Sequence, residues 1–452
     1  MHPLDVGALA TAAAIRARSL SSEEATTAVF GRIAAHNPAL HAIVEEHRTA
    51  ALREARKKDE RPSDAPFHGV PIAIKDLNFV RFHTTRFGSR GMPALWSPMD
   101  DVSVSRLRAA GFVIVGKTAC SELGVLPITE PAGQPPTRNP WRLDRSPGGS
   151  SGGAASAVAA GCLPVAHGSD GGGSIRIPAS FCGLVGLKAT RGRIPNHLGL
   201  SDPGIIYTCG ALARTVDDAE AMLHVQGGAG EPARAGPLRV RMVLDVPLIA
   251  TDPHVRAAIE AAAAVLVAEG HHVEVGVAPA GEVDDFLPIW QHLFAQILIM
   301  RWAKAEPVTR WLGEEGKRHR AADVRARQAE LVARWSPFVE GVDVLLTPTV
   351  AVPAPEIGSL HEEDGEAHFR RVALLGAWTA PFNITGHPAL SVPVGLHPFG
   401  TPIGAQLAGP MGSEATLLSV ARTLEAAFPL SGRPAVWAGE GGADGAAAQG
   451  EG

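Results

Sequence analysis

Two serines in glycine-rich segments are the residues of this sequence best suited to chemistry. Ser150 lies in the run GGSSGG at positions 148–153, and Ser174 directly follows three glycines at positions 171–173. Glycines add little to a hydrophobic core, but they let backbone N–H groups approach a hydroxyl without interfering side chains. The pattern is typical of a site where a serine nucleophile meets hydrogen-bond donors.

A lysine supplies the base that such a nucleophile needs. Hydrolysis of an amide requires a nucleophile, a base that activates it, donors for the oxyanion and an acid for the leaving amine. Lys75 ends the apolar run Val70–Ile74, and burial lowers the pKa of a lysine from about 10.4 by disfavouring the ammonium form. We therefore predict that Lys75 is a neutral base. The alternative is an exposed lysine at a strand end with no chemical role.

The glycines before Ser174 are expected to stabilise the oxyanion. Without side chains, several N–H groups of this segment are free to converge on one point, as an oxyanion hole requires. The alternative is a tight turn before a helix, although three consecutive glycines exceed what a turn needs. We predict donors from Gly171, Gly172 and Gly173, together with Ser174.

Two further patterns match known motifs in letters but not in physical character. Residues 111–118 fit the P-loop expression, yet their four middle residues, Phe-Val-Ile-Val, predict a strand rather than a phosphate-wrapping loop. The pattern Gly-x-Ser-x-Gly occurs around both Ser150 and Ser151, but a nucleophile elbow must follow a buried strand. The preceding residues 138–147 are polar and contain two prolines. We therefore expect neither a nucleotide site nor an α/β-hydrolase.

The histidines show no spacing typical of a metal site. His271 and His272 begin an alternating strand pattern, so their side chains are expected on opposite faces. His361 precedes three acidic residues in a segment typical of a solvated loop. Since every catalytic role already has a protein group, we expect no metal and no cofactor, and an activity that survives a chelator.

Composition limits the partners. The chain has 452 residues and a net charge of −5, so it offers no basic surface for nucleic acid. It has no signal peptide pattern and no apolar run of about 18 residues, so no membrane association is expected. Its four cysteines lack CxxC spacing, which predicts reduced core residues and a cytoplasmic location. We expect a small-molecule substrate and a monomer or homodimer.

The elements that position these groups follow an α/β pattern. Short apolar segments at Val70–Ile74, Phe112–Val115 and Val342–Leu346 alternate with alanine-rich helices such as Ala154–Ala160. This alternation predicts a mixed, mostly parallel, twisted central sheet covered by helices on both faces.

Domain organisation is expected to be simple. Residues 1–438 are predicted to form a single domain, and the Gly/Ala-rich tail 439–452 is predicted to be disordered. Residues 285–335 are predicted to be largely helical and to form a substrate-pocket or lid segment. This segment carries four tryptophans, which are more often core than substrate platform: Trp290, Trp302, Trp311 and Trp335.

Several of these motifs together resemble the amidase signature family, over roughly residues 20–225 and 340–428. The resemblance rests on Gly69-Val70-Pro71, Lys75-Asp76, Gly116-Lys117-Thr118, Thr137-Arg138-Asn139-Pro140-Trp141, GGSSGG, Gly173-Ser174-Ile175-Arg176, Cys182-Gly183-Leu184-Val185-Gly186-Leu187-Lys188 and Phe382-Asn383-Ile384-Thr385-Gly386-His387-Pro388.

The resemblance implies a Ser–Ser–Lys triad. Ser174 would be the acylated nucleophile, Lys75 the base, and Ser150 the residue that relays the proton between them. In this family the bridging serine follows a cis peptide bond, here Gly149–Ser150. The remaining implied roles are hydrogen bonding around the site for Ser151 and Asp170 and ion pairing for Arg176.

One departure from the family pattern bears on the substrate. Many members have threonine where this chain has Gly171, and the segment 167–178 resembles the branch with cyclic nylon-oligomer hydrolases, aryl acylamidases and urethanases. The smaller residue favours bulky acyl groups. The resemblance implies hydrolysis of amide, anilide or carbamate C–N bonds. The alternative is an amidotransferase subunit that supplies ammonia within a tRNA-dependent complex.

Overall fold

A large mixed β-sheet runs through the computed structural model, in which residues 2–195, 206–430 and 434 are described. The tail 439–452, which the sequence predicts to be disordered, lies outside the described residues. The strands follow the order β1 (Ile43–Glu46), β5 (Val113–Thr118), β2 (Pro71–Lys75), β6 (Val165–Asp170), β8 (Thr208–Ala213), β7 (Val185–Lys188), β12 (Ala389–Leu396), β13 (Pro402–Ala408), β11 (Val344–Pro348), β9 (Arg239–Met242) and β10 (His272–Val275). A short separate hairpin consists of β3 (Thr84–Thr85) and β4 (Leu95–Trp96).

The strand directions correct one part of the predicted fold. Of the neighbouring pairs in the described sheet, β2–β5, β2–β6, β9–β10 and β9–β11 are parallel, whereas six pairs are antiparallel. The sheet is mixed, as predicted, but the expectation of mostly parallel pairing was wrong. Two of the antiparallel pairs arise because β8 is inserted between β6 and β7 and runs antiparallel to both. A third arises because β12 and β13 are consecutive strands joined by a short connection. Alternation along the sequence does not reveal such an insertion.

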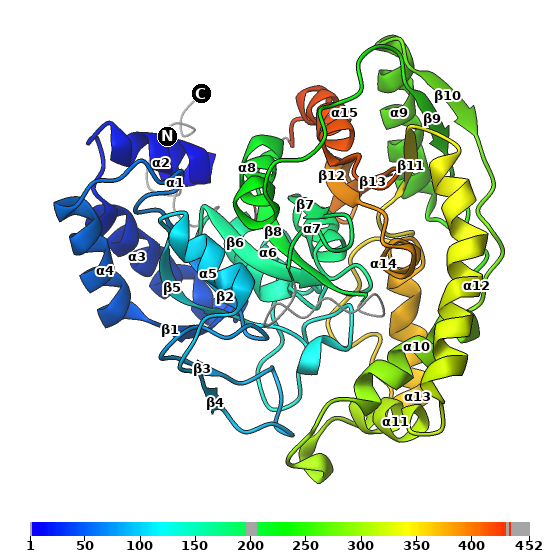
Figure 1. The fold of residues 1–452 in the computed structure, drawn as a ribbon, viewed down its shortest axis with the longest axis horizontal. Helices are drawn as coiled ribbons and strands as arrows, with labels where there is room; N and C mark the ends of the chain where they lie inside the picture. The colour runs from blue at the N-terminus through cyan, green and yellow to red at the C-terminus, as the bar shows by residue number, and fades with distance from the viewer. Residues whose placement is uncertain (1, 196–205, 431–433, 435–452) are drawn as a thin grey trace, which may run out of the picture.

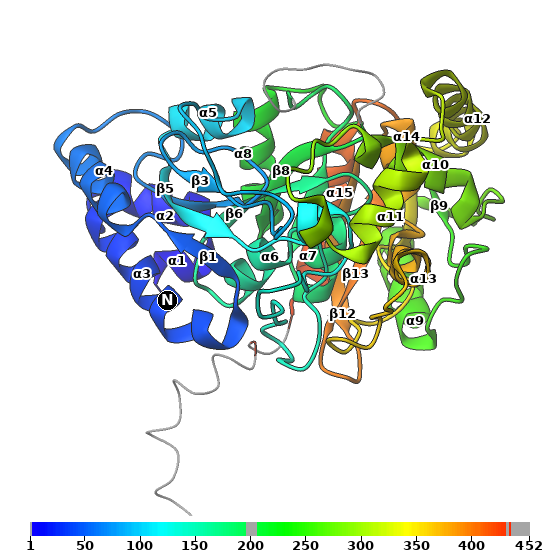
Figure 2. The same cartoon turned by 90° about the horizontal axis from the view of Figure 1, so that it is seen from below.

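Helices cover both faces of the sheet, as the two views in Figure 1 and Figure 2 show. They are α1 (Pro3–Val6), α2 (Ala8–Arg16), α3 (Ser22–Leu40), α4 (Arg48–Glu60), α5 (Val102–Ala109), α6 (Gly152–Ala159), α7 (Arg176–Cys182), α8 (Val216–Gly227), α9 (Pro253–Ala268), α10 (Val283–Ala295), α11 (Pro307–Gly316), α12 (Ala321–Glu340), α13 (Gly365–Ala373), α14 (Ala380–Thr385) and α15 (Glu414–Ala427).

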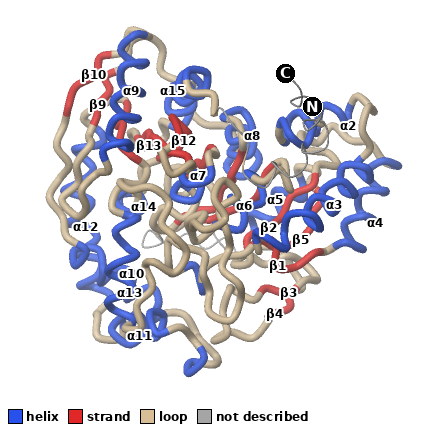
Figure 3. Tube along the Cα trace, turned by 180° about the vertical axis from the view of Figure 1, so that it is seen from behind, coloured by secondary structure: helices blue, strands red, loops and turns tan. Residues whose placement is uncertain are grey.

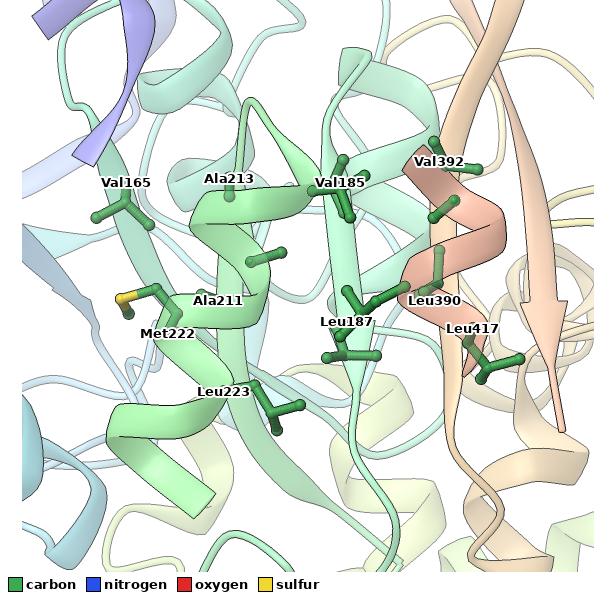
Figure 4. Close-up of a cluster of buried hydrophobic side chains, with 14 of the residues drawn as sticks. Val165, Val185, Leu187, Ala211, Ala213, Met222, Leu223, Leu390, Val392 and Leu417 are labelled. Atoms are coloured by element: carbon green, nitrogen blue, oxygen red, sulfur yellow. The ribbon is translucent and has the colours of Figure 1, made fainter. Parts of the chain in front are cut away.

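Two hydrophobic cores lie on the opposite faces of the sheet. Helices α2, α5, α8, α9 and α15 pack on one face, and α3, α4, α6 and α7 pack mainly on the other. Figure 4 shows α8 and α15 laid over β6, β8, β7 and β12 in the first of these cores. In β2, Ile72 and Ile74 belong to the first core and Ala73 to the second. Because side chains alternate along a strand, Lys75 shares the face of Ala73, toward α6.

The sequence predictions for local structure are largely confirmed. The apolar segments form β2, β5 and β11 with bounds shifted by one to three residues. The P-loop look-alike is a strand, and its Lys117 is buried 3.3 Å from the Asp76 carboxylate. All four cysteines are buried in the described chain, and no disulfide joins them. None of the described helices is both long enough and apolar enough to cross a bilayer.

The segment 285–335 is helical, as predicted. It contains most of α10, all of α11, most of α12 and a short 3₁₀ turn at Trp302–Lys304. These helices form a group with α13 at one end of the molecule, as seen in Figure 1 and from behind in Figure 3. Helix α10 packs against both α11 and α12, and α11 packs against α13.

Candidate active site

Lys75 ends the buried strand β2 and lies beside the GGSSGG loop. Its side chain is fully buried. The Nζ atom donates hydrogen bonds to Ser150 Oγ at 2.8 Å, to Ser169 Oγ at 3.1 Å and to the Ser169 carbonyl oxygen at 3.3 Å. The strand therefore delivers the lysine to one of the two predicted serines.

The surroundings of Lys75 favour its neutral form. Burial lowers the pKa of Lys75 to about 8, against a smaller opposite effect of nearby groups that include the Asp170 carboxylate. Desolvation penalises the ammonium because its partners here are neutral oxygens rather than a paired carboxylate. A lysine with such a pKa is partly deprotonated near neutral pH and is able to accept a proton.

The GGSSGG loop holds Ser150 in a tightly packed position. The peptide bond between Gly149 and Ser150 is cis. A Cβ atom on Gly149 would lie 2.5 Å from the backbone oxygen of Ile128, so only glycine fits there. Ser151 Oγ donates to the Ser169 carbonyl at 3.2 Å, and its backbone N–H donates to the Ser174 carbonyl at 3.2 Å. Ser151 thus connects this loop to one residue before and one residue after the three glycines at 171–173.

Asp170 shapes the segment that leads to Ser174. Its carboxylate accepts hydrogen bonds from the N–H groups of Gly173 at 2.8 Å and Ile175 at 3.2 Å. Gly173 has a φ of +122°, and a Cβ atom there would collide with the Thr379 hydroxyl. The carboxylate and the glycine together turn the chain sharply before α7 begins.

A buried ion pair fixes Asp170. Arg176 donates to the two Asp170 oxygens at 3.0 and 2.9 Å, and both side chains are completely buried. Burial alone would raise the pKa of Asp170, but the Arg176 guanidinium outweighs it and holds the pKa well below the usual range. Asp170 is therefore an anion, and its carboxylate oxygens accept hydrogen bonds from the backbone of this turn and from Arg176.

We expect that Arg176→Met destabilises the protein strongly. The substitution keeps much of the side-chain volume but leaves the Asp170 carboxylate charged, buried and without its cation. Breaking a buried pair in this way costs about 3–5 kcal/mol of unfolding free energy. The measurement is the midpoint of urea unfolding, followed by circular dichroism.

The matched control for this prediction is Arg318→Met. Arg318 pairs with Glu315 at 2.6 Å, but its side chain is 74% exposed. Such a surface pair is worth about 0–1 kcal/mol, so the unfolding midpoint should barely move. Equal destabilisation by the two substitutions would contradict the structural role of the Asp170–Arg176 pair.

Two residues that the sequence did not single out complete this network. Asn383 Nδ2 donates to the Asp170 carbonyl at 2.9 Å and to its carboxylate at 3.0 Å, while Asn383 Oδ1 accepts from Arg176 at 2.7 Å. Gln406 Oε1 accepts from Arg176 at 2.8 Å. Asn383 appeared only as a letter in a family motif, and Gln406 carried no local signal.

Ser169 is a third residue that sequence reasoning missed. It accepts two hydrogen bonds from Lys75 and lines the same cavity as Ser150 and Ser174. Its position directly before Asp170 in β6 was the available signal, because β6 is parallel to β2 and pairs with it. Ser169 therefore shares the lysine with Ser150.

The predicted nucleophile lies at the edge of an open space. Ser174 lines the cavity together with Gly171 and Gly172. Its hydroxyl has no hydrogen-bond partner among the described residues, Ser150 included. The N–H groups of Gly171, Gly172 and Ser174 likewise make no hydrogen bond within the described chain, whereas the Gly173 N–H is bound to Asp170. Three of the four predicted donors thus remain available to a ligand.

The cavity has a volume of about 440 Å³ and is strongly apolar. Among the described residues that line it, none carries a charge. Trp290 covers its polar end, where the indole ring lies 3.2 Å from the position of a Cβ atom on Gly172. The largest apolar side chains around it are Phe87, Phe286, Trp290, Phe294 and Phe369, and most come from α10 or α13.

The predicted pocket segment contributes only in part. Helix α10 and the residues just after it line the cavity, but no residue of α11 or α12 does so in the described structure. Trp311 packs against Phe369, and Trp335 is buried in a separate core cluster. Trp290 is thus the one of the four named tryptophans that lines the cavity.

Comparisons with known proteins find similar sequences and similar folds. The Amidase family model matches residues 24–418. The 6-aminohexanoate-cyclic-dimer hydrolase of Pseudomonas sp. (strain NK87) is 36% identical, and the alignment covers 96% of this chain and 97% of that protein. A solved structure of 6-aminohexanoate cyclic dimer hydrolase superposes with a TM-score of 0.88 at 32% identity, over 96% of this chain and 100% of the other. A bacterial aryl acylamidase has the same fold, with a TM-score of 0.82 at 23% identity over 94% of this chain and 96% of the other.

Proposed function

Since the chain belongs to the amidase signature family and is a hydrolase of carbon–nitrogen bonds, we propose that it cleaves amides through an acyl-enzyme on Ser174. The observation that carries the proposal is the 2.8 Å hydrogen bond from a fully buried Lys75 to Ser150, beside the cavity that Ser174 lines. Relatives at 32–36% identity are hydrolases by name, which favours hydrolysis over the amidotransferase alternative.

The proposed reaction begins with proton transfer away from Ser174. Neutral Lys75 accepts the Ser150 proton while Ser150 accepts the proton of the Ser174 hydroxyl, and Ser174 Oγ attacks the amide carbon. The hydroxyl contact between the two serines forms when substrate binds, since catalytic hydrogen bonds often tighten only in the complex. The same relay returns the proton to the leaving amine, after which water attacks the ester with the relay again acting as base.

The developing oxyanion is assigned to the free N–H groups of the glycine segment. In this proposal Gly171, Gly172 and Ser174 donate, because their N–H groups are available and line the cavity. Gly173 does not donate to the oxyanion, because its N–H binds Asp170 and holds the turn in place. Donors fixed in advance stabilise the transition state without reorganisation at the moment of reaction.

A substrate panel tests the proposed function. Purified protein is incubated with simple amides, anilides, esters and carbamates, and the products are identified by mass. We expect release of the amine and the free acid from at least one amide or anilide. Hydrolysis of esters alone would contradict the proposal, and so would ammonia release that requires a second protein subunit.

The pH dependence of kcat/KM should report the titration of Lys75. The base must be neutral, and burial lowers the pKa of Lys75 to about 8. We expect kcat/KM to rise by about tenfold per unit below about pH 8 and to level off above it. A flat profile between about pH 6 and 9 in single-turnover acylation would exclude a lysine base.

The cavity lining predicts a preference for neutral substrates. A carboxylate buried among apolar side chains without a cation loses several kcal/mol of hydration free energy. We therefore expect hexanoyl p-nitroanilide to be cleaved with a kcat/KM at least about 100-fold higher than adipoyl p-nitroanilide, which carries a terminal carboxylate. The methyl ester of the latter is the matched control and should recover most of the loss. Equal rates for the charged and neutral anilides would contradict an uncharged cavity.

A further inference from the structure

The peptide bond between Gly172 and Gly173 lies in the middle of the proposed oxyanion hole. The peptides on either side of it carry the N–H groups of Gly172 and Ser174, two of the three donors assigned above. In a planar trans peptide the carbonyl and the N–H point in opposite directions, so the Gly172 carbonyl and the Gly173 N–H turn as one unit. Glycine places few steric limits on such a turn. The conformation of this segment therefore depends on contacts from outside it.

This central peptide is held at both ends. The Gly173 N–H donates to the Asp170 carboxylate at 2.8 Å. At the other end, the Thr379 hydroxyl donates to the Gly172 carbonyl oxygen at 2.6 Å. Thr379 directly precedes α14 and is completely buried. A side chain from a distant part of the chain thus fixes the peptide that separates two of the proposed donors.

The Thr379 hydroxyl has a second acceptor nearby, but the contact to Gly172 is the better hydrogen bond. The Gly376 carbonyl oxygen lies 3.3 Å from the hydroxyl, and it already accepts the Thr379 N–H at 3.0 Å. A hydroxyl has one proton to donate, and the shorter contact has the usual length of an O–H···O bond. Thr379 is also β-branched, which restricts rotation about χ1. The hydroxyl is therefore held in its direction toward the glycine segment.

The direction of the Gly172 carbonyl matters for the electrostatics of the cavity. Gly172 lines the cavity, whereas Thr379 is absent from the described lining, so the hydrogen bond draws the carbonyl oxygen toward α14. Rotation of the peptide would bring this partly negative oxygen toward the cavity and tilt the N–H groups on either side. An oxyanion that forms there would lose aligned donors and meet a dipole of the wrong sign, and both effects raise the barrier.

From this arrangement we propose that Thr379 is a positioning residue for the oxyanion hole, an inference that rests on the proposed function. Thr379 touches no reacting atom and acts through the Gly172 carbonyl. Two neighbouring peptides have anchors of their own. Asn383 of α14 donates to the Asp170 carbonyl at 2.9 Å, and the Ile177 N–H donates to the Gly173 carbonyl at 2.7 Å. Helix α14 and the residue before it thus hold the glycine segment at two carbonyl groups.

Three variants separate the Thr379 hydroxyl from the rest of the side chain. Thr379→Ala should lower kcat for hexanoyl p-nitroanilide by about 10–100-fold and change KM by less than about threefold, because misplaced donors weaken only the transition state. Thr379→Ser restores the hydroxyl and should recover kcat to within about fivefold of the unmodified protein, since serine rotates more freely about χ1. Thr385→Ala is the matched control. The Thr385 hydroxyl donates to the Pro381 carbonyl at 3.0 Å within the same helix, and its loss should leave kcat unchanged.

Inhibition by a transition-state mimic gives a measurement that a change in fold stability alone would not move. Pentyl trifluoromethyl ketone is expected to react with Ser174: the Oγ–carbon bond forms, the carbonyl π pair becomes an oxyanion, and the proton passes through Ser150 to Lys75. In Thr379→Ala its inhibition constant should rise by the same factor by which kcat/KM falls. Methyl pentyl ether has the same chain but forms no oxyanion, so its inhibition constant should stay the same.

The outcomes distinguish this inference from the proposed function. Unchanged kcat and unchanged inhibition by the ketone in Thr379→Ala would overturn the inference and leave the proposed function standing. An equal fall in kcat in Thr379→Ser or in Thr385→Ala would also overturn it, because the loss would then come from packing rather than from the hydroxyl. Hydrolysis that survives in Ser174→Ala would overturn the proposed function, and the inference with it.

Discussion

Ser174→Ala is expected to abolish amide hydrolysis while leaving the fold unchanged. The substitution removes one hydroxyl that makes no hydrogen bond to another described residue, so no buried partner loses a contact. It also removes the proposed nucleophile, and loss of a nucleophilic serine lowers kcat by about 10⁴–10⁶-fold. The measurement is kcat on the best anilide of the panel, together with the melting temperature, which should move by less than about 2 °C.

A covalent label locates the nucleophile independently. An activated phosphonate should add to one serine, and peptide mass analysis should place the label on Ser174. The exposed Ser105 of α5 offers a matched control: Ser105→Ala should keep both labelling and activity. If another serine were labelled while Ser174 stayed unmodified, Ser174 would not be the nucleophile.

The local structure of the candidate site was predictable from the sequence because it depends on short segments. The apolar run before Lys75 predicted a buried strand that ends in a lysine with a lowered pKa, and the structure has both. The glycines around Ser150 and Ser174 predicted close backbone approach, which the packing of Gly149 and Gly173 explains. In each case the residue type and its immediate neighbours carry the physical reason.

Contacts between segments that are distant in the sequence could not be predicted from residue type and local sequence. Asn383 reaches Asp170 across 213 positions and Gln406 reaches Arg176 across 230, and neither has a neighbour that marks it as polar and buried. The order of strands likewise depends on long-range pairing, so the antiparallel insertion of β8 escaped prediction.

Lys75 and Ser150 should behave as one unit when both are replaced. Lys75→Met keeps a chain of similar length and removes the base, and Ser150→Ala removes the relay between that base and Ser174. Each single change should lower kcat by about 10³–10⁵-fold. The double variant should be no more than about threefold worse than the poorer single variant, because a proton relay fails completely once either member is lost.

Two further measurements support the comparison of the single and double variants of Lys75 and Ser150. One is a control for additive effects, and the other is the pH profile. Lys304→Met removes an exposed lysine at the end of the 3₁₀ turn, and its small effect should simply multiply with that of Ser150→Ala. The rise of kcat/KM toward about pH 8 should also vanish in Lys75→Met, since the group that titrates is gone. Multiplying losses for Lys75 and Ser150 would mean that the two act independently. A persisting rise in Lys75→Met would assign the base to another group, and the 2.8 Å hydrogen bond would then serve only to hold the GGSSGG loop against β2.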